Sequence, residues 1–508
     1  MKKRMLPVLC LLLLYVGVNG QKDGLYSVRD FGAKGDGIHL DSRAINLAIQ
    51  AAAKAGGGKI IIPAGTYLCG SIHLESRITL ELAEGALLIG APPGLKAYDP
   101  AEKFPFPQYQ DGGHTFFHNS LIWGVDLQDV SIVGHGRING GGLTARDKDY
   151  SAPPDGGSIG TADKIIALKL CKRVLIEGIT IYHGGHFAIL VTGCDQVTLD
   201  HLLIDTNRDG IDIDGCSNTV VNNCDVNSPN DDAICPKSSF ALNRNQVTQN
   251  LVITNCRVSA YKEGTLLDGT CVPQKKGWSG GRIKFGTESN GGFRNCVVSN
   301  CIFRSCDGLA LEEVDGGLME NIVVDNLTME DVRDYPIYIT VGTRNRGPRD
   351  STQIGQIRNV FISNVIATGV DSLSGIQITG TRESKVENIH LRDIFLSFKG
   401  GGSQSAGEKV FPELGNHYPE PVLLGENPAY GIFIRHARDI YLDDIVLKTQ
   451  KPDYRPVMIG NDVEGLTIQG FKFNPVPGVE PVMLRDVHHL SVSLSPMLDR
   501  LDSTELRP

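Results

Sequence analysis

Two acidic motifs lie close together in this chain of 508 residues, Asn-Arg-Asp-Gly-Ile-Asp at 207–212 and Asn-Asp-Asp-Ala-Ile-Cys-Pro-Lys at 230–237. If the isoleucines of both motifs face a common core, Asp209 lies beside Asp232 on a neighbouring strand, about 4.7–4.9 Å away, with Asp231 next to them. Like charges at that spacing repel, so the pKa of one carboxyl should be raised. One protonated carboxyl and two carboxylates can protonate a leaving oxygen and activate water, which is the chemistry of glycosidic bond hydrolysis.

These acids have an alternative, purely local role. Asp and Asn are common in turns, where their side chains accept backbone hydrogen bonds, so a turn explains any single acid as well as catalysis does. Three acids that converge from two neighbouring strands are much harder to explain in this way. Asp209, Asp231 and Asp232 are therefore the candidate catalytic residues.

Short apolar segments that could position these acids recur about every 22 to 32 residues. Each is a β-branched run with period-two alternation that ends at Asn, Asp or Gly, and each is too short to bury a core alone. Stacked coils bury one continuous core. The pairs Gly193-Cys194 and Gly215-Cys216 stand 22 residues apart, which suits a β-helix coil better than a leucine-rich horseshoe or a helical array. The sequence thus predicts an all-β, single-stranded, right-handed parallel β-helix of about ten coils.

The first 70 or so residues predict a secretory signal followed by a cap on the first coil of the β-helix. Residues 1–20 combine a basic start, an apolar stretch and small residues before Gln21, which is typical of a secretory signal. We expect export to the periplasm or beyond, and no later apolar run is long enough to span a membrane. The remaining residues 21–508 form one β-helix domain, whose open first coil needs a cap at about 25–70.

Within the cap, the alanine-rich segment Arg43–Ala55 predicts a helix. Asp41 or Ser42 could cap its start, and three glycines end it. The following residues 59–67 read as the first strand and its turn.

Composition limits the partners. A net charge of −9 argues against nucleic acid as a partner, although it does not exclude an acidic substrate in a groove of different charge.

Eleven of the 12 cysteines follow Cys10, and several occupy equivalent repeat positions, which favours buried free thiols over a disulfide framework. No paired Cys and His pattern indicates a metal site, so we expect neither metal nor cofactor, and a monomer.

With these motifs the chain resembles glycoside hydrolase family 28, the polygalacturonase and rhamnogalacturonase family, over nearly all of residues 21–508. The first motif is similar to the family's Asn-Thr-Asp-Gly-x-Asp, with Arg208 in place of Thr, and the second resembles Asp-Asp-Cys-x-x-x-Lys-Ser. The resemblance implies that Asp231 is the general acid, while Asp209 and Asp232 hold and activate the water that inverts the anomeric centre. Inversion would place the acid and base carboxyls roughly 6.5–9.5 Å apart.

Two further motifs of that family are altered here. Gly280 stands where the family's Gly-His-Gly has its histidine, although the following Phe-Gly-Thr-Glu fits well. The family's Arg-Ile-Lys falls on Ala310-Leu311-Glu312, so both basic residues that hold a galacturonate carboxylate in the family are absent there.

Other residues could replace the missing charges. Lys284 or Arg282 could bind the carboxylate, although a salt bridge from Lys284 to Asp212 is an equally good explanation of that lysine. Glu312 could instead hydrogen-bond a neutral sugar. Arg344 in a Gly-Pro loop suits a uronate, but a solvated loop charge is the commoner case, and His186 near the coil of Asp209 is more often structural. The candidate substrate-binding residues are Asn207, Asp212, Lys237, Lys284, Glu312, Arg282, Arg344 and His186.

Long excursions interrupt the coils at 100–120, 143–162, 261–281 and 400–430, and loops of this length are usually functional. If these excursions close one end of a substrate-binding groove, they would favour removal of terminal sugars over cleavage inside a polymer. The aromatic residues of these excursions include Phe104, Phe106, Tyr109, Trp278 and Tyr418.

The hypothesis that best fits these features is an inverting, exo-acting hydrolase of galacturonate-containing bonds in pectic poly- or oligosaccharides. A calcium-dependent pectate-type lyase on the same fold is one alternative, and it would lose activity in chelator and release an unsaturated product. A non-catalytic carbohydrate-binding solenoid is the other, and the converging acids argue against it.

Overall fold

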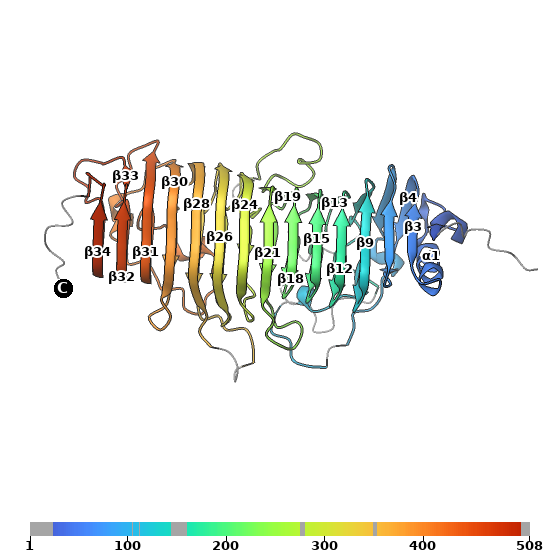
Figure 1. The fold of residues 1–508 in the computed structure, drawn as a ribbon. Helices are drawn as coiled ribbons and strands as arrows, with labels where there is room; N and C mark the ends of the chain where they lie inside the picture. The colour runs from blue at the N-terminus through green and yellow to red at the C-terminus, as the bar shows by residue number, and fades with distance from the viewer. Residues whose placement is uncertain are drawn as a thin grey trace, which may run out of the picture.

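The computed structural model describes residues 24–103, 105–110, 112–143, 160–274, 280–348 and 353–498. Almost all regular structure in these residues is parallel β-strand, and the chain advances from one end of a rod to the other (Figure 1). Each coil adds a strand to up to three stacks that surround a single core. The predicted parallel β-helix is therefore confirmed. The predicted signal at 1–20, Phe104 and Trp278 lie outside the described residues.

The first stack carries the acidic motifs and is called the catalytic stack below. Its strands pair in parallel from β5 to β29 and continue into the first residues of β31, β32 and β34. Its members are β5 (Ile72–His73), β8 (Ser120–Val125), β11 (Lys164–Lys169), β14 (Phe187–Thr192), β17 (Asp209–Asp214), β20 (Ile234–Lys237), β23 (Ile283–Phe285), β25 (Leu309–Glu313), β27 (Ile337–Val341) and β29 (Ile376–Thr379).

The second stack is the longest, with fifteen strands, which is more coils than the ten or so predicted. Most of the additional coils lie at the N-terminal side, before the regular repeats begin, and one lies at the C-terminal end. Its members are β1 (Leu25–Ser27), β3 (Gly58–Ile62), β6 (Ile78–Leu82), β9 (Gln128–Gly134), β12 (Lys172–Glu177), β15 (Asp195–Asp200), β18 (Ser217–Asn222), β21 (Thr248–Thr254), β24 (Phe293–Arg304), β26 (Leu318–Glu330), β28 (Gln356–Val370), β30 (Val386–Phe398), β31 (Ile432–Thr449), β32 (Met458–Gln469) and β34 (Val482–Ser493).

The third stack closes the coil. From β24 onward its strands are the second halves of the long strands of the second stack. Its separate members are β2 (Asp36–Leu40), β4 (Gly65–Cys69), β7 (Ala86–Gly90), β10 (Arg137–Asn139), β13 (Thr180–Tyr182), β16 (Leu203–Asp205), β19 (Asp225–Asn227), β22 (Arg257–Ser259) and β33 (Lys472–Phe473). The helices and 3-10 turns are η1 (Val28–Phe31), α1 (Ser42–Lys54), η2 (Pro93–Leu95), η3 (Gly112–His114), α2 (Gln404–Gly407) and α3 (Pro421–Leu424).

The predicted register of the acidic motifs is confirmed. Ile211 of β17 pairs with Ile234 of β20, and both side chains are fully buried in the core. Because side chains alternate across a strand, the residues on either side of each isoleucine face outward on the catalytic stack. The same register carries Lys284 of β23 beside Ala310 of β25.

The cap forms largely as predicted. Helix α1 spans Ser42–Lys54 and buries one apolar face against the first coils. Asp41 precedes it, but its carboxylate accepts backbone hydrogen bonds from Lys34 and Gly35, at 2.6 and 2.9 Å, instead of capping the helix. The prediction that the first strand follows the helix is wrong, because β1 and β2 precede it. β1 has only three residues and β2 is mostly exposed, so neither shows apolar alternation.

Repeated polar side chains stabilise the turns between coils. A ladder of asparagines donates amide hydrogen bonds from coil to coil at 2.8–3.3 Å, through Asn218, Asn250, Asn295, Asn321, Asn359 and Asn388. Each has a positive φ, a conformation that Asn tolerates better than most residues. All eleven cysteines among the described residues are free and ten are buried, which confirms the predicted thiol packing.

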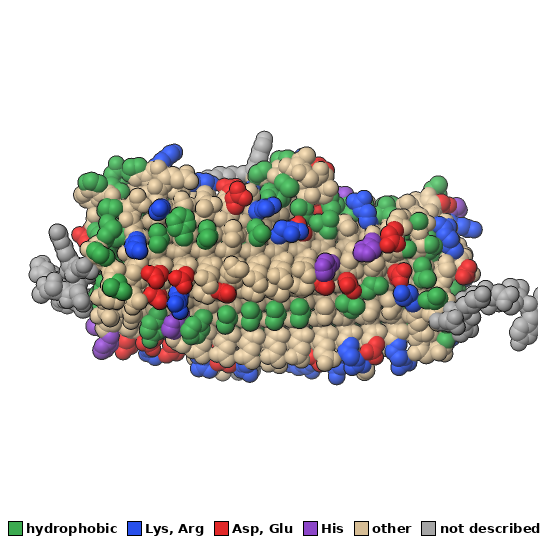
Figure 2. All heavy atoms as spheres, turned by 45° about the horizontal axis from the view of Figure 1, so that its top comes forward, with side chains coloured by type: hydrophobic (Ala, Val, Ile, Leu, Met, Phe, Trp, Pro, Cys, Tyr) green, Lys and Arg blue, Asp and Glu red, His purple; other side chains and the backbone are tan. Residues whose placement is uncertain are grey.

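The outward face of the second stack carries an apolar column. Figure 2 shows hydrophobic side chains in a row along the rod. In this column the rings of Phe361, His390 and Tyr441 stack at centroid distances of 4.2 Å. No helix among the described residues has the length and apolar character needed to cross a bilayer.

Candidate active site

Three carboxylates meet where β17 and β20 begin. One oxygen from each of Asp209, Asp231 and Asp232 lies within 4.8 Å of the others. The backbone N–H of Asp232 donates to Asp209 Oδ1 at 3.1 Å and to Asp231 Oδ1 at 3.2 Å. These oxygens are closer than the roughly 6.5–9.5 Å expected for an inverting pair. The cause is local, because two of the acids are consecutive and the third lies one strand spacing away.

The acids differ strongly in their surroundings. Burial raises the pKa of Asp209 well above its usual value, and the neighbouring charges of Asp212 and Asp231 raise it further. Asp232 is also buried, yet Arg282 and Lys284 outweigh the burial and hold its pKa below the usual range. The surroundings therefore shift the pKa of two neighbouring carboxyls in opposite directions. The raised pKa belongs to Asp209.

Two cations bind Asp232, Lys284 of β23 and Arg282 directly before it. Lys284 Nζ lies 2.6 Å from Asp232 Oδ2 and Arg282 Nε lies 2.5 Å from Oδ1. The other two nitrogens of Arg282 donate to both oxygens of Glu420, at 3.0 and 2.9 Å. The alternative salt bridge from Lys284 to Asp212 is therefore wrong. Both cations already have carboxylate partners within the protein, which argues against their expected role of binding the sugar carboxylate.

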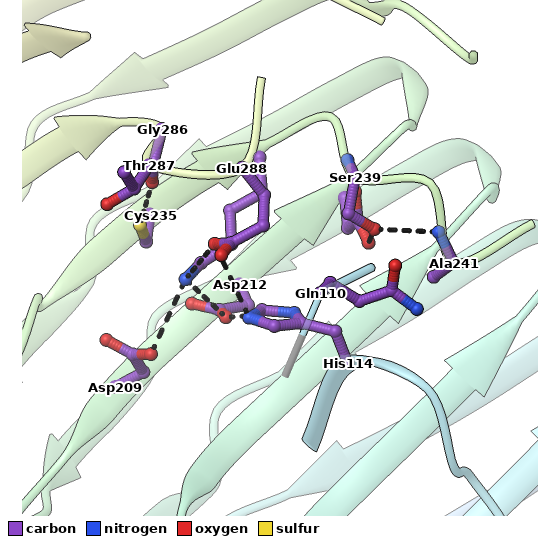
Figure 3. Close-up of polar contacts among 12 residues, drawn as sticks. Gln110, His114, Asp209, Asp212, Cys235, Ser239, Ala241, Gly286, Thr287 and Glu288 are labelled. Atoms are coloured by element: carbon purple, nitrogen blue, oxygen red, sulfur yellow. Dashed lines mark hydrogen bonds and ion pairs between the residues drawn. The ribbon is translucent and has the colours of Figure 1, made fainter. Parts of the chain in front are cut away.

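A second buried charge cluster adjoins the first (Figure 3). Lys237 Nζ lies 3.7 Å from Asp209, 3.6 Å from Asp212 and 3.4 Å from Glu288. Burial alone would lower the pKa of Lys237, but Asp212 and its other acidic neighbours raise it well above its usual value. His114 lies 3.9 Å from Asp212 and 3.8 Å from Glu288. Lys237 thus links Asp209, one of the candidate catalytic carboxyls, to Asp212 and Glu288.

Arg344 is also part of the protein's own ion pairs. Its guanidinium binds both oxygens of Asp315, and its Nη2 donates to the carbonyl oxygen of Thr287 at 3.0 Å. The side chain is only 6% exposed. The interpretation of Arg344 as a solvated loop charge is therefore wrong. Through its contacts with Asp315 and the Thr287 carbonyl, Arg344 helps to hold the segment around Thr287 beside Lys237 and Lys284.

Asn207 and His186 border the cluster without joining it. The carbonyl oxygen of Asn207 accepts from the backbone N–H of Asn230 at 3.1 Å, which ties the two motifs together. His186 is 6% exposed, and its ring packs edge-on against Phe187, whose strand position is directly beside Asp209. These contacts fit a structural role for His186.

Gly280 explains why the family's histidine is missing. A Cβ atom on Gly280 would lie 2.0 Å from the carbonyl oxygen of Asp231. The backbone N–H of the next residue, Gly281, donates to that same oxygen at 2.7 Å. Any side chain at Gly280 would therefore displace Asp231, and glycine permits the close approach that fixes this acid.

Glu312 is a buried carboxyl without a partner. It is 1% exposed, and neither side-chain oxygen has a hydrogen-bond partner among the described residues. Burial raises the pKa of Glu312 from 4.5 to about 7, even though Lys284 and Arg282 oppose the shift. Glu312 is therefore largely protonated in the folded protein below neutral pH.

We expect Glu312→Gln to flatten the pH dependence of stability. Between pH 4.5 and 7 the unfolded chain loses this proton and the folded protein keeps it, so the free energy of unfolding of the wild type falls as pH rises. Gln cannot ionise and removes this contribution. Urea unfolding at pH 5 and pH 7 should show a smaller fall for the variant. The exposed Glu177→Gln serves as the control, and equal slopes in all three proteins would contradict the buried carboxyl.

Two segments cross the catalytic stack on either side of the acids. On the N-terminal side, Phe117 packs on Phe187 and Leu190, and His114 of the same segment reaches Asp212. On the C-terminal side, Tyr418 accepts a hydrogen bond from Thr287 at 3.0 Å, and Glu420 binds Arg282. One segment from each side of the acids therefore packs on the catalytic stack, and these two segments are called the two walls below.

Sequence reasoning missed several residues of the site: His114, Glu288, Glu420 and the contact of Arg208 with Asp231. Glu288 could have been found from the sequence. Gly286 lies in the same column as Lys237, and Glu288 follows Gly286 by two residues. His114 and Glu420 reach the site from loops, and strand periodicity carries no signal for such contacts.

Comparisons with known proteins agree with this architecture. One family model, described as rhamnogalacturonase A/epimerase, pectate lyase-like, matches residues 25–103, and another, described as right handed beta helix region, matches residues 157–275. A probable polygalacturonase from Vitis vinifera is 27% identical over 60% of this chain and 61% of its own length. The exo-poly-alpha-D-galacturonosidase of Dickeya chrysanthemi is 23% identical over 74% of this chain and 67% of its own length.

Among solved structures, the family 28 exopolygalacturonase of Yersinia enterocolitica superposes with a TM-score of 0.63. It is 18% identical to this chain, and the match covers 92% of this chain and 78% of that one. The likeness therefore concerns the fold. The matched region covers less than two thirds of the Vitis relative, at 61% of its length.

Proposed function

The chain belongs to glycoside hydrolase family 28, and from this premise we propose that it is an inverting, exo-acting hydrolase of galacturonate-containing bonds in pectic chains. The observation that carries the proposal is the meeting of Asp209, Asp231 and Asp232 within 4.8 Å, in surroundings that raise the pKa of Asp209 and lower that of Asp232. An acid that protonates the leaving oxygen and a carboxylate that activates water are the two groups the reaction needs.

In the proposed reaction, Asp231 gives its proton to the glycosidic oxygen as the bond to the anomeric carbon breaks. A water molecule held by Asp209 and Asp232 adds to the anomeric carbon from the opposite face and gives a proton to the carboxylate cluster. Asp231 suits the acid role because its side chain, at 19% exposed, is the most accessible of the three. The short separation of the acids requires one side chain to turn aside before water can enter.

Exo action is supported by the two walls. The segment with His114 and the segment with Tyr418 and Glu420 both pack on the catalytic stack beside the acids. A polymer that runs along the stack would meet them, whereas a chain end can enter between them. We therefore propose release of a terminal sugar.

A calcium-dependent lyase is a weaker alternative. The three acids could ligate a cation, but both oxygens of Asp232 already contact a cation of the protein. Displacing two buried ion pairs would be costly.

The test is hydrolysis of trigalacturonate and of homogalacturonan in buffer with and without chelator. We expect monomer as the first small product, a slow fall in polymer viscosity, and the inverted anomer in the proton NMR spectrum of the first-formed product. Chelator should have no effect. A rapid fall in viscosity would contradict exo action, a retained anomer would contradict inversion, and an ultraviolet-absorbing unsaturated product would indicate the lyase.

A further inference from the structure

Arg208 occupies the motif position at which the family has threonine. It lies in the turn between β16 and β17, directly before Asp209. Its Nη2 donates to Asp231 Oδ2 at 2.6 Å. A threonine hydroxyl carries no charge and could not form this ion pair. The substitution therefore places a fixed positive charge on the proposed general acid itself.

The other cations around the acids are enclosed. The side chains of Arg282, Lys284 and Lys237 are between 2% and 7% exposed, and each contacts at least one catalytic carboxylate. The side chains of Arg208 and Asp231 are 17% and 19% exposed. Among the described residues that pair with the three catalytic acids, Arg208 is thus the cation most accessible to an incoming anion.

The contact also conflicts with proton donation. Both oxygens of Asp231 act as acceptors, one from Arg208 and the other from the backbone N–H of Asp232 at 3.2 Å. A general acid needs one oxygen that carries a proton and points at the leaving oxygen. An N–H donor 2.6 Å away occupies that direction. Arg208 must therefore leave Asp231 before the proposed acid can act.

We propose that Arg208 binds the carboxylate of the galacturonate next to the scissile bond, and that this exchange of partners releases Asp231 for catalysis. The inference rests on the proposed function. Arginine matches a planar carboxylate with paired N–H donors, so the sugar carboxylate is a competent replacement for Asp231. The freed oxygen of Asp231 then takes up a proton from solvent and gives it to the glycosidic oxygen as the bond to the anomeric carbon breaks. The acid step thereby depends on a negative charge on the substrate, at a site where the family's own basic pair is missing.

The experiment compares kcat/KM for trigalacturonate and for its fully methyl-esterified form. The wild type should prefer the free acid. Arg208→Thr, which restores the family residue, should lower kcat/KM on the free acid by about 10-fold or more, the scale of a lost hydrogen bond to a charged group. The same variant should raise kcat/KM on the ester, because Arg208 no longer holds Asp231 when the substrate carries no carboxylate. Arg208→Lys, which keeps the charge without the paired donors, should restore part of the preference.

Arg173→Thr is the matched control, because Arg173 forms an exposed pair with Asp129 at 2.5 Å on the second stack, away from the catalytic stack. Its preference should equal that of the wild type. If Arg208→Thr lowers both rates equally, Arg208 only supports the structure and the inference is overturned. If the wild type hydrolyses neither form of the trisaccharide nor homogalacturonan, the proposed function fails, and the inference fails with it.

Discussion

Asp231→Asn is expected to lower kcat by at least about 10²-fold, the lower end of what a general acid contributes. Asparagine has nearly the same shape but no acidic proton to give to the leaving oxygen. Because Asp231 is held by its backbone contact with Gly281, the variant should keep its fold. Hydrolysis of trigalacturonate measures the loss, and circular dichroism checks the fold.

Asp129→Asn is the matched control for this prediction. Asp129 is also paired with an arginine, Arg173, but it lies exposed on the surface. Its replacement should leave kcat unchanged. Near-normal turnover in folded Asp231→Asn would show that another group protonates the leaving oxygen.

The second large effect is on stability. We expect Arg282→Met to lower the free energy of unfolding by about 3–5 kcal/mol, the usual cost of removing one partner of a buried ion pair. Arg282 is 5% exposed and binds Asp232 and Glu420, which lie on different segments. Methionine fills a similar volume but leaves Glu420 without the guanidinium that binds it and Asp232 with Lys284 as its remaining cation. Urea unfolding followed by far-ultraviolet circular dichroism measures the loss.

Arg257→Met provides the comparison. Arg257 pairs with Asp225 at 2.8 Å, but its side chain is 54% exposed, and surface pairs contribute about 0–1 kcal/mol. A loss in Arg282→Met no greater than in Arg257→Met would show that Asp232 and Glu420 find other partners or become protonated.

The sequence alone predicts the coil and the register well. Ile211 and Ile234 belong to strands with clear alternation, and one residue of slip would expose the whole apolar set, so the pairing is strongly specified. This register is enough to bring Asp209 next to Asp232. The columns that contain Lys284 and Glu312 follow from the same alternation.

Partners across the groove could not be predicted in the same way. Periodicity places Lys284 on the correct face, but it does not say which carboxylate its long side chain reaches, and it reaches Asp232. Arg344 lies in a loop, where no repeat applies, and its burial against Asp315 depends on how that loop folds back. His114 comes from an excursion that interrupts the coils, so its place beside Asp212 depends on tertiary packing.

The bond between Arg282 and Glu420 joins residues 138 positions apart, and this separation sets an order of events during synthesis. A ribosome adds about 5–20 residues each second and domains begin to fold from the N-terminus, so roughly 7 to 28 seconds separate the two residues. The coils that bear Asp209, Asp231 and Asp232 can stack well before that interval ends. Until Glu420 arrives, a nascent chain holds these carboxylates beside the N-terminal segment of His114 and Phe117 alone. The newly made protein therefore acquires its acids early and its enclosed site late.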